Sequence, residues 1–286
     1  MIKKPLIKIP ENWNLTEEQL WKIFEVERSK ALILKNEQNR KIRKTLYGTV
    51  YEEYFEKLPF HPQFKIKNDS ILKNARLEFQ LNQIRPFFTR KTNFVEIGAG
   101  DCSLTIEASK YCNSTCALEV SDEIVKNISF PKNAQCLIFD GFSFPFESDS
   151  IDLAYSNQLM EHLHPEDAIE QVKDIYRILK KGGKYICITP NGINGPHDIS
   201  RFYGNDLVGF HLKEYLPSEL KKLFIANGFK RVRAYIIVKS KIFYLSIRLI
   251  RIVEIMLLFF PKKIRNKLCD FSLLKRINNV VIIAIK

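Results

Sequence analysis

A glycine-containing turn between an apolar run and a helical pattern constrains this 286-residue chain most strongly. The turn reads VEIGAGDC and spans residues 95–102. Glycines let the backbone approach a ligand closely, and the start of the following helix offers unpaired N–H groups. Beyond the turn, apolar runs alternate with helical patterns, which predicts an α/β fold with a doubly wound, mostly parallel sheet.

Seven apolar runs have the length and composition of strands. They cover residues 94–97, 116–120, 135–139, 151–156, 184–189, 231–238 and 280–285. Residues 1–91 contain helical patterns instead, beginning at a capping box over residues 16–19 and continuing over 47–58 and 70–85. We therefore expect a helical N-terminal extension or cap over 1–91 and a sheet domain over 92–286.

Acidic residues follow the second and third predicted strands. Glu119 lies 21 residues after Gly98, and Asp140 comes directly after the third strand. In parallel sheets the ligand lies outside the carboxyl ends of the strands, where the strand order reverses. A carboxylate at the position of Glu119 can accept hydrogen bonds from both hydroxyls of a ribose. The pattern predicts a nucleoside-containing cofactor.

The charge near the turn favours S-adenosylmethionine (SAM) over a dinucleotide. A dinucleotide site has a third glycine where this chain has Ser103, and it places a pyrophosphate at the helix start. Glu96 would repel a pyrophosphate, but it suits the cationic amino acid part of SAM. Electrostatics therefore indicates SAM as the cofactor.

Four segments resemble the successive motifs of class I SAM-dependent methyltransferases, in the branch that acts on small molecules, lipids and sugars. They read VEIGAGDCSLT, ALEVS, FDGFSFPFESDSIDLAYSNQLMEHL and RILKKGGKYICITPN. The resemblance covers about 92–238 and the last strand. It implies a Rossmann-like sheet of seven strands with an antiparallel last strand. The helical insertion that we expect before that strand lies where simpler relatives have a short turn.

The resemblance also assigns the cofactor residues. It implies that Glu96, Gly98 and Gly100 hold the methionine end of SAM, with Asp101 in the same turn. Glu119 would hold the ribose, Asp140 would contact the adenine, and Asn157 would lie near the transferring methyl. Cys102 is a departure, since many members have a third glycine there, and we expect it to adjust the turn without removing the site.

Three histidines are candidates for a base that assists methylation of an oxygen. They are His162, after the fourth strand, and His197 and His211, after the fifth. A positioned base contributes about 10²–10⁴-fold to such a step. The alternative is that these histidines form site walls or cap loops, with Asp198 and Glu214 as partners.

Several other kinds of chemistry are disfavoured. The six cysteines form no CxxC pair and do not cluster with histidines at zinc spacing, so we expect buried reduced thiols and no metal site. The tetrapeptide [DNS]PP[YF], which serves methylation of nucleobase amino groups, is absent after the fourth strand. A paired-cysteine arrangement for C5 methylation is absent too.

The net charge of +13 is unevenly distributed. Residues 1–91 and 239–276 each carry +8, whereas 92–238 carry −4. The insertion over 239–276 has a helical pattern that places Lys241, Tyr244, Arg248, Arg251 and Glu254 on one side. We expect residues 241–265 to contact the protein core, a second copy of the chain or an anionic membrane surface, with nucleic acid as the least favoured alternative.

Taken together, these patterns predict a cytosolic SAM-dependent methyltransferase acting on a small-molecule, sugar or lipid-linked acceptor, at oxygen. The N-terminus lacks the apolar core of a signal peptide, and no charge-free apolar run approaches about 20 residues. The alternative location is that of a peripheral protein at the inner face of the membrane. An RNA methyltransferase and a non-catalytic SAM-binding scaffold are the alternatives, with nucleic acid the less favoured partner.

Overall fold

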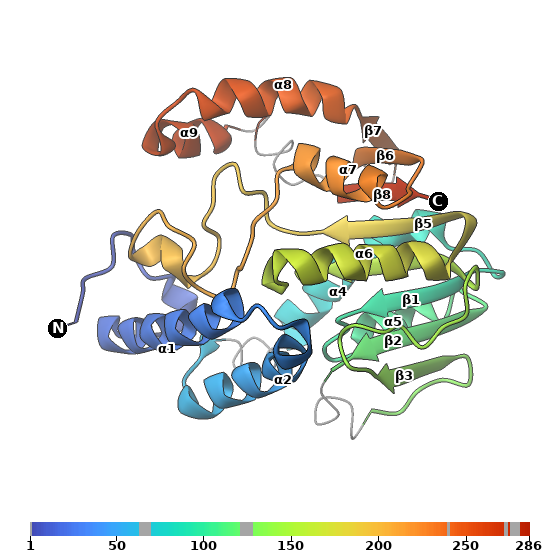
Figure 1. Ribbon diagram of the computed structural model, residues 1–286, viewed down its shortest axis with the longest axis horizontal. Coiled ribbons are helices and arrows are strands. Elements are labelled where there is room, and N and C mark those ends of the chain that lie inside the picture. Colours follow the sequence, from blue (N-terminus) through green and yellow to red (C-terminus); the bar gives the residue numbers. More distant parts are fainter. Residues whose placement is uncertain (1, 63–69, 121–127, 239–240, 272–273, 275–280) are drawn as a thin grey trace.

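The computed structural model describes residues 2–62, 70–120, 128–238, 241–271, 274 and 281–286. Within them, eight strands form one sheet that lies between helices (Figure 1). The strands are β1 (Asn93–Ile97), β2 (Ser114–Glu119), β3 (Ala134–Ile138), β4 (Ile151–Asn157), β5 (Leu179–Ile188), β6 (Arg231–Val238), β7 (Lys241–Leu245) and β8 (Val281–Ile285). The longer helices are α1 (Glu17–Asn36), α2 (Arg40–Lys57), α4 (Ser70–Ile84), α5 (Ser103–Ala108), α6 (Pro165–Ile178), α7 (Pro217–Ala226), α8 (Ile247–Leu258) and α9 (Lys262–Cys269).

The strand order is β3-β2-β1-β4-β5-β8-β6-β7. β1 to β5 are parallel, and β8 is antiparallel to both of its neighbours, β5 and β6. The order reverses between β1 and β4, so the carboxyl ends of these two strands border the crevice where ligands bind in such sheets. The predicted α/β fold with a mostly parallel sheet and an antiparallel last strand is confirmed.

Helices cover both faces of the sheet. On one face, α6 and α7 bury residues such as Val172, Ile175 and Phe224 against β4, β5 and β8. On the other face, α4 and α5 bury Ile84 and Leu104 against β1 and β4. Both faces are thus sealed from water, which is why the parallel strands are continuous apolar runs.

The helices α1 and α2 lie at the end of the sheet toward which the arrows of β1 and β5 point (Figure 1). The capping box predicted at residues 16–19 starts α1: Gln19 N donates to Thr16 Oγ1 and Thr16 N donates to Gln19 Oε1. A separate core cluster joins α1 and α2 to the segment after β5, through residues such as Phe202 and Phe210. The N-terminal helices therefore pack over the carboxyl edge of the sheet.

A buried ion pair fixes α2 to α6. Arg43 is fully buried, and its Nε and Nη2 donate to the two carboxylate oxygens of Asp167 at 2.7 and 2.8 Å. Nη1 donates to the carbonyl oxygens of Glu37 and Gln38, and Tyr47 Oη donates to Asp167. Because every donor of the guanidinium group has a geometrically suited acceptor, its burial is tolerated.

Two predictions about the flanking segments are wrong in detail. Helix α2 begins at Arg40, whereas the predicted helical pattern began at residue 47, because the charged side chain of Arg43 is buried against Asp167, a residue distant in sequence. Residues 241–245 form β7, a strand in addition to the seven predicted, where the sequence predicted the first turn of a helix. The residues Ile242, Phe243 and Tyr244 have high strand propensity, and pairing with β6 extends the sheet.

The helical part of the insertion presents a different face from the one expected; residues 239–240, 272–273 and 275–276 of the insertion lie outside the described residues. Glu254, predicted on the same side of the helix as Arg248 and Arg251, is 3% exposed and accepts a hydrogen bond from Ser218 N. Ile250 and Leu257 are buried on the same face. The exposed face of α8 is instead largely apolar. Among the described residues, no helix has the length and hydropathy that a membrane crossing requires.

We predict that Arg43→Met lowers the free energy of unfolding by about 3–5 kcal/mol, because it leaves the buried carboxylate of Asp167 without its charged partner. Chemical denaturation measures this change. Lys173→Met, which removes an exposed ion pair with Glu170, is the control and should change stability by about 0.5 kcal/mol or less. Equal effects of the two substitutions would contradict the structural role of Arg43.

Candidate active site

The glycine turn lies between β1 and α5. Gly98 has φ +69° and Gly100 has φ +57°, backbone conformations that residues with a Cβ rarely adopt. A Cβ on Gly98 would also lie 3.1 Å from Leu159 Cδ1. Gly98 N and Ala99 N both donate to Leu118 O, which ties the turn to the end of β2. The backbone path therefore favours glycine at both positions.

Cys102 occupies the position where a third glycine was expected. Its φ is +55°, in the left-handed region, and its side chain is completely buried. The cysteine thus keeps the backbone conformation that glycine favours, at a cost of about 1–2 kcal/mol for a residue with a Cβ. The expectation that Cys102 adjusts the turn without removing it agrees with this geometry.

Glu96 provides a buried carboxylate at the end of β1. It is 6% exposed, and Thr105 Oγ1 donates to its Oε2 at 2.6 Å. Burial, together with the negative charges of Asp101 and Glu119, raises the pKa of Glu96 to about 8. The structure brings three acidic side chains to this turn, so the arrangement fits a cationic ligand and disfavours a pyrophosphate.

Glu119 lies at the end of β2 and faces the turn. Gly100 N donates to its Oε2 at 2.7 Å, and Val120 N donates to its Oε1 at 2.8 Å. A carboxylate has about four acceptor sites, so lone pairs remain for two ribose hydroxyls. The backbone bonds fix its orientation beforehand.

Two lysines from the N-terminal helices reach the other predicted cofactor residues. Lys73 of α4 forms an ion pair with Asp101 at 3.0 Å, and Lys44 of α2 forms one with Asp140. Asp140 also accepts from Phe142 N and Ser143 N at 2.8 Å. Against the opposing effect of burial, these contacts hold the pKa of Asp140 below its usual value. The sequence patterns gave no signal for these two lysines.

Asn157 is the last residue of β4. The preceding residue, Ser156, pairs with Ile97 of β1, so Asn157 lies beside the start of the glycine turn. This is the switch point of the sheet. From Asn157 the chain continues into the turn that contains His162.

The structure brings two of the three candidate histidines together. Glu161 and His162 lie in the turn Met160–His162 after β4, and His211 comes from the segment after β5. The two imidazole rings are 5.0 Å apart between centroids, in an edge-to-face arrangement. One ligand atom each from Glu161, His162 and His211 lies within 4.8 Å of the others.

Each member of this acidic–histidine cluster (Glu161, His162 and His211) is held by neighbours. His162 Nδ1 lies 3.2 Å from Phe210 O and 3.1 Å from Tyr51 Oη, and His211 Nδ1 lies 2.6 Å from Glu214 Oε1. Thr189 Oγ1 donates to Glu161 Oε2 at 2.8 Å. These contacts orient three side chains from two segments toward one another.

Burial sets the protonation of the cluster. It raises the pKa of Glu161 to about 7 and, together with the neighbouring His211, lowers the pKa of His162 to about 3. For His211, burial is outweighed by Glu214 and by the charges of Glu161 and Asp198, which raise its pKa. His162 is therefore neutral near pH 7.

His197 lies outside the cluster. Its Nε2 is 3.0 Å from Asn191 O, a carbonyl oxygen that can only accept, and its backbone N donates to Glu214 Oε1. Of the two partners that the sequence suggested, Glu214 contacts both His197 and His211, whereas Asp198 Oδ2 accepts from His211 N. In this structure His197 supports the loop that carries Glu214.

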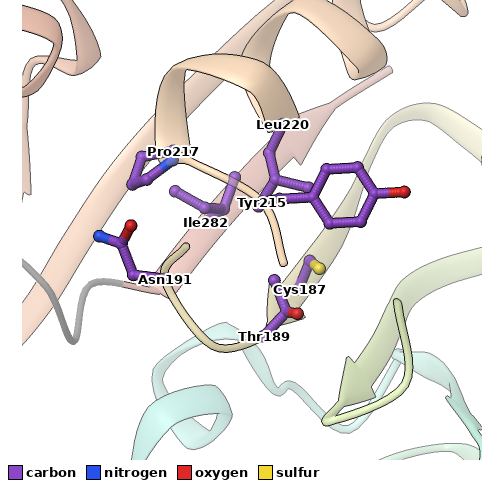
Figure 2. A pocket seen from close by; sticks show the side chains of 7 residues that line it. All are labelled: Cys187, Thr189, Asn191, Tyr215, Pro217, Leu220 and Ile282. Atoms are coloured by element: carbon purple, nitrogen blue, oxygen red, sulfur yellow. The ribbon is translucent and has the colours of Figure 1, made fainter. Parts of the chain in front are cut away.

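A small pocket adjoins the cluster. Figure 2 shows its lining side chains, which come from the end of β5 and its following turn, from the start of α7, and from β8. They are Cys187, Thr189, Asn191, Tyr215, Pro217, Leu220 and Ile282. Burial raises the pKa of Cys187 to about 12, so it is a neutral thiol, and Thr189 connects the pocket to Glu161.

The comparison with known proteins concerns the central part of the chain. Residues 95–187 match a family model described as a methyltransferase domain. A probable S-adenosylmethionine-dependent methyltransferase of Mycolicibacterium smegmatis is 31% identical over 86 residues. That match spans 30% of this chain and 31% of the relative, so it concerns under a third of the relative's length.

Solved structures share the fold. A SAM-dependent methyltransferase from Archaeoglobus fulgidus has a TM-score of 0.50 and 19% identity, covering 74% of this chain and 94% of its own. Phosphoethanolamine N-methyltransferase 1 of Haemonchus contortus, solved with phosphoethanolamine and S-adenosylhomocysteine, has a TM-score of 0.53 and 15% identity. Its match covers 87% of this chain and 50% of that one.

The reversed strand order, the glycine turn and the acid after β2 define a nucleoside-binding α/β domain. Three carboxylates at the turn select a cationic ligand within that class. Over residues 95–187 the chain is similar to methyltransferase domains, its fold is shared with SAM-dependent methyltransferases, and SAM is the cofactor that this similarity supports.

We predict that the affinity for SAM rises with pH, because Glu96, with a pKa of about 8, must lose its proton to face the cofactor's positive charge. Between about pH 6.5 and about pH 8, the gain should approach tenfold per unit. Calorimetry across this range measures it. Glu96→Gln should bind more weakly at about pH 8 and lose this pH dependence, whereas an unchanged slope in the variant would contradict the role of Glu96.

Proposed function

We propose that this chain transfers the methyl group of SAM to an oxygen of a small-molecule, sugar or lipid-linked acceptor. The acidic–histidine cluster carries the proposal, since it lies just beyond the switch point where Asn157 ends β4. Glu161 and His162 follow that strand, and His211 reaches the same place from the segment after β5. Methylation of an oxygen needs such polar groups, because the acceptor must lose a proton.

The cofactor residues divide the ligand among them. Glu96, Gly98, Gly100 and Asp101 hold the amino acid end, where the carboxylates match its ammonium group. Glu119 holds the ribose. Asp140 and the N–H groups that surround it stand where the adenine would lie, and Asn157 is nearest the methyl. Lys44 and Lys73 keep the acids at either end of the site in place.

SAM supplies an activated methyl group and leaves as the neutral thioether S-adenosylhomocysteine. The acceptor O–H bond breaks, its proton passes to a neutral imidazole of the cluster or to water, and a new O–CH₃ bond replaces the S–CH₃ bond. Holding acceptor and methyl in line is worth up to about 7–11 kcal/mol in favourable systems. The chain therefore contributes mainly position and a place for the proton.

We propose further that residues 1–91 act as a cap over the acceptor side of the domain in 92–286. Tyr51 of α2 contacts His162, and Glu27 of α1 accepts from Phe210 N at 2.9 Å. The segment after β5 and the N-terminal helices thus form one wall. An enclosed acceptor site favours a small acceptor group and the exclusion of water from the reaction.

The expected activity is methyl transfer from labelled SAM into one fraction of a cell extract. Once that acceptor is identified, His162→Ala and His211→Ala should each lower turnover at saturating substrate by about 10²-fold or more, because both rings serve the acceptor oxygen. His164→Asn is the matched control: His164 is the N-cap of α6, a role that asparagine can fill. Full turnover in both alanine variants would reject the proposed use of the cluster.

We also propose that the insertion binds an anionic membrane surface. The exposed face of α8 and its following turn is apolar, with Phe259 83% exposed. The large side chains exposed there are Leu249, Ile252, Ile255, Met256, Leu258, Phe259 and Phe260. Helix α9 follows with Lys262, Lys263, Arg265 and Lys267. An apolar face beside clustered positive charge suits the headgroup region of such a membrane.

Vesicle flotation tests this surface. The protein should float with vesicles containing phosphatidylserine and not with neutral vesicles, and Met256→Ser with Phe259→Ser should abolish the effect. Phe79→Ser, at an exposed phenylalanine of α4, is the matched control and should leave flotation unchanged. Failure to float, with a dimer in sedimentation that the double substitution dissociates, would replace the membrane by a second copy of the chain.

A further inference from the structure

The acidic–histidine cluster brings one buried carboxylate and two imidazole rings close together. Glu161 is 0% exposed, and its Oε1 has no hydrogen-bond partner. The nearest nitrogen of His162, Nε2, lies 3.9 Å away, too far for a hydrogen bond. A buried carboxylate oxygen without a partner is costly unless a ligand satisfies it.

The outer partners determine which nitrogen of each ring faces the centre. The carbonyl oxygen of Phe210 can only accept, so its contact favours a proton on His162 Nδ1, with Tyr51 Oη as a second acceptor, and leaves a lone pair on Nε2. The carboxylate of Glu214 does the same for His211 by accepting from Nδ1. Thr189 donates to the outer oxygen of Glu161 and leaves Oε1 available. This arrangement is the one by which proteins orient metal-binding histidines.

We propose that Glu161, His162 and His211 bind a divalent transition metal ion. Two imidazole nitrogens and one carboxylate oxygen are a ligand set that zinc and iron enzymes use in catalysis, with further positions left open. No paired cysteines are needed, which is why cysteine spacing gave no signal and the sequence predicted no metal.

The dimensions are close to those of a metal site. Atoms bound to one ion at about 2.1 Å lie roughly 3–3.5 Å apart, so the three atoms, now within 4.8 Å of one another, would move slightly inward. The side chain of His162 is 29% exposed, which gives the ion a path from solvent. The side chains of Glu161 and His211 are less exposed, at 0% and 10%.

The metal inference deepens the proposed function and rests on it for the role of the ion in catalysis. A divalent ion there would hold an acceptor oxygen and lower the pKa of its hydroxyl, so that the proton can leave to water. The acceptor would then be expected to present two neighbouring oxygens, because an ion with three protein ligands has open positions on one side. Binding of the ion itself is independent of SAM and of the acceptor.

A proton is the competing occupant of the cluster. His211, whose pKa is raised, could carry a second proton on Nε2 and direct it toward Glu161. A protonated His211 would satisfy Glu161 without any ion. A metal titration separates the two, since it would then show no binding at this place.

The test uses the full chain, treated with a chelator and then titrated with Co²⁺ while its visible absorption is followed. One ion should bind per chain, give the bands of nitrogen and oxygen ligation without thiolate charge-transfer bands, and be displaced by Zn²⁺. Glu161→Gln and His211→Asn should abolish these bands. Glu214→Gln, which removes the carboxylate that holds His211 Nδ1, should weaken binding by about 10–100-fold.

Controls keep the result interpretable. His164→Asn should bind Co²⁺ like the parent chain, and Zn²⁺ should raise the unfolding temperature of the parent but not of Glu161→Gln. Absence of bound Co²⁺, or binding that survives Glu161→Gln, would overturn the site. If Co²⁺ binds but chelator-treated enzyme transfers methyl at the full rate, the catalytic role fails, whereas absent transfer with intact Co²⁺ binding rejects the proposed function alone.

Discussion

The buried contact between Arg43 and Asp167 is the interaction on which the arrangement of the site depends. It joins a helix of the N-terminal segment to α6, directly after the turn that carries Glu161 and His162. With α2 held there, Lys44 reaches Asp140 and Tyr51 reaches His162. One ion pair thus sets the position of both ends of the site, and its burial makes that position specific, because a shifted helix would leave two charges unsatisfied.

Both halves of the site contain buried carboxylates. At the glycine turn, Glu96 and Glu119 lie where we propose the amino acid end and the ribose of SAM, and burial together with the neighbouring acids raises the pKa of Glu96. At the cluster, Glu161 is likewise a buried carboxylate, and two imidazole rings lie beside it. A negatively biased interior inside a strongly basic protein explains why the total charge says little about the chemistry.

Sequence reasoning succeeded where the determinants are local. The capping box at Thr16, the strands β1 to β5 and the positions of Glu96 and Glu119 follow from patterns spanning a few residues. It failed at residues 241–245 and at Glu254, since edge pairing with β6 and a hydrogen bond from Ser218 N decided both. The grouping of His162 with His211, and the exclusion of His197, likewise depended on contacts with Phe210, Glu214 and Asn191.

The sequence by itself determined the class of fold and its cofactor, because the glycine turn, the acids after two strands and the alternation of strands and helices are encoded in short stretches. Only the tertiary structure decided what surrounds the acceptor. Cys102 is found in a glycine conformation, Arg43 is found inside the protein, and three ligand atoms from two distant segments meet at one point. These contacts depend on how the helices pack over the carboxyl edge of the sheet, and local sequence patterns do not predict that packing.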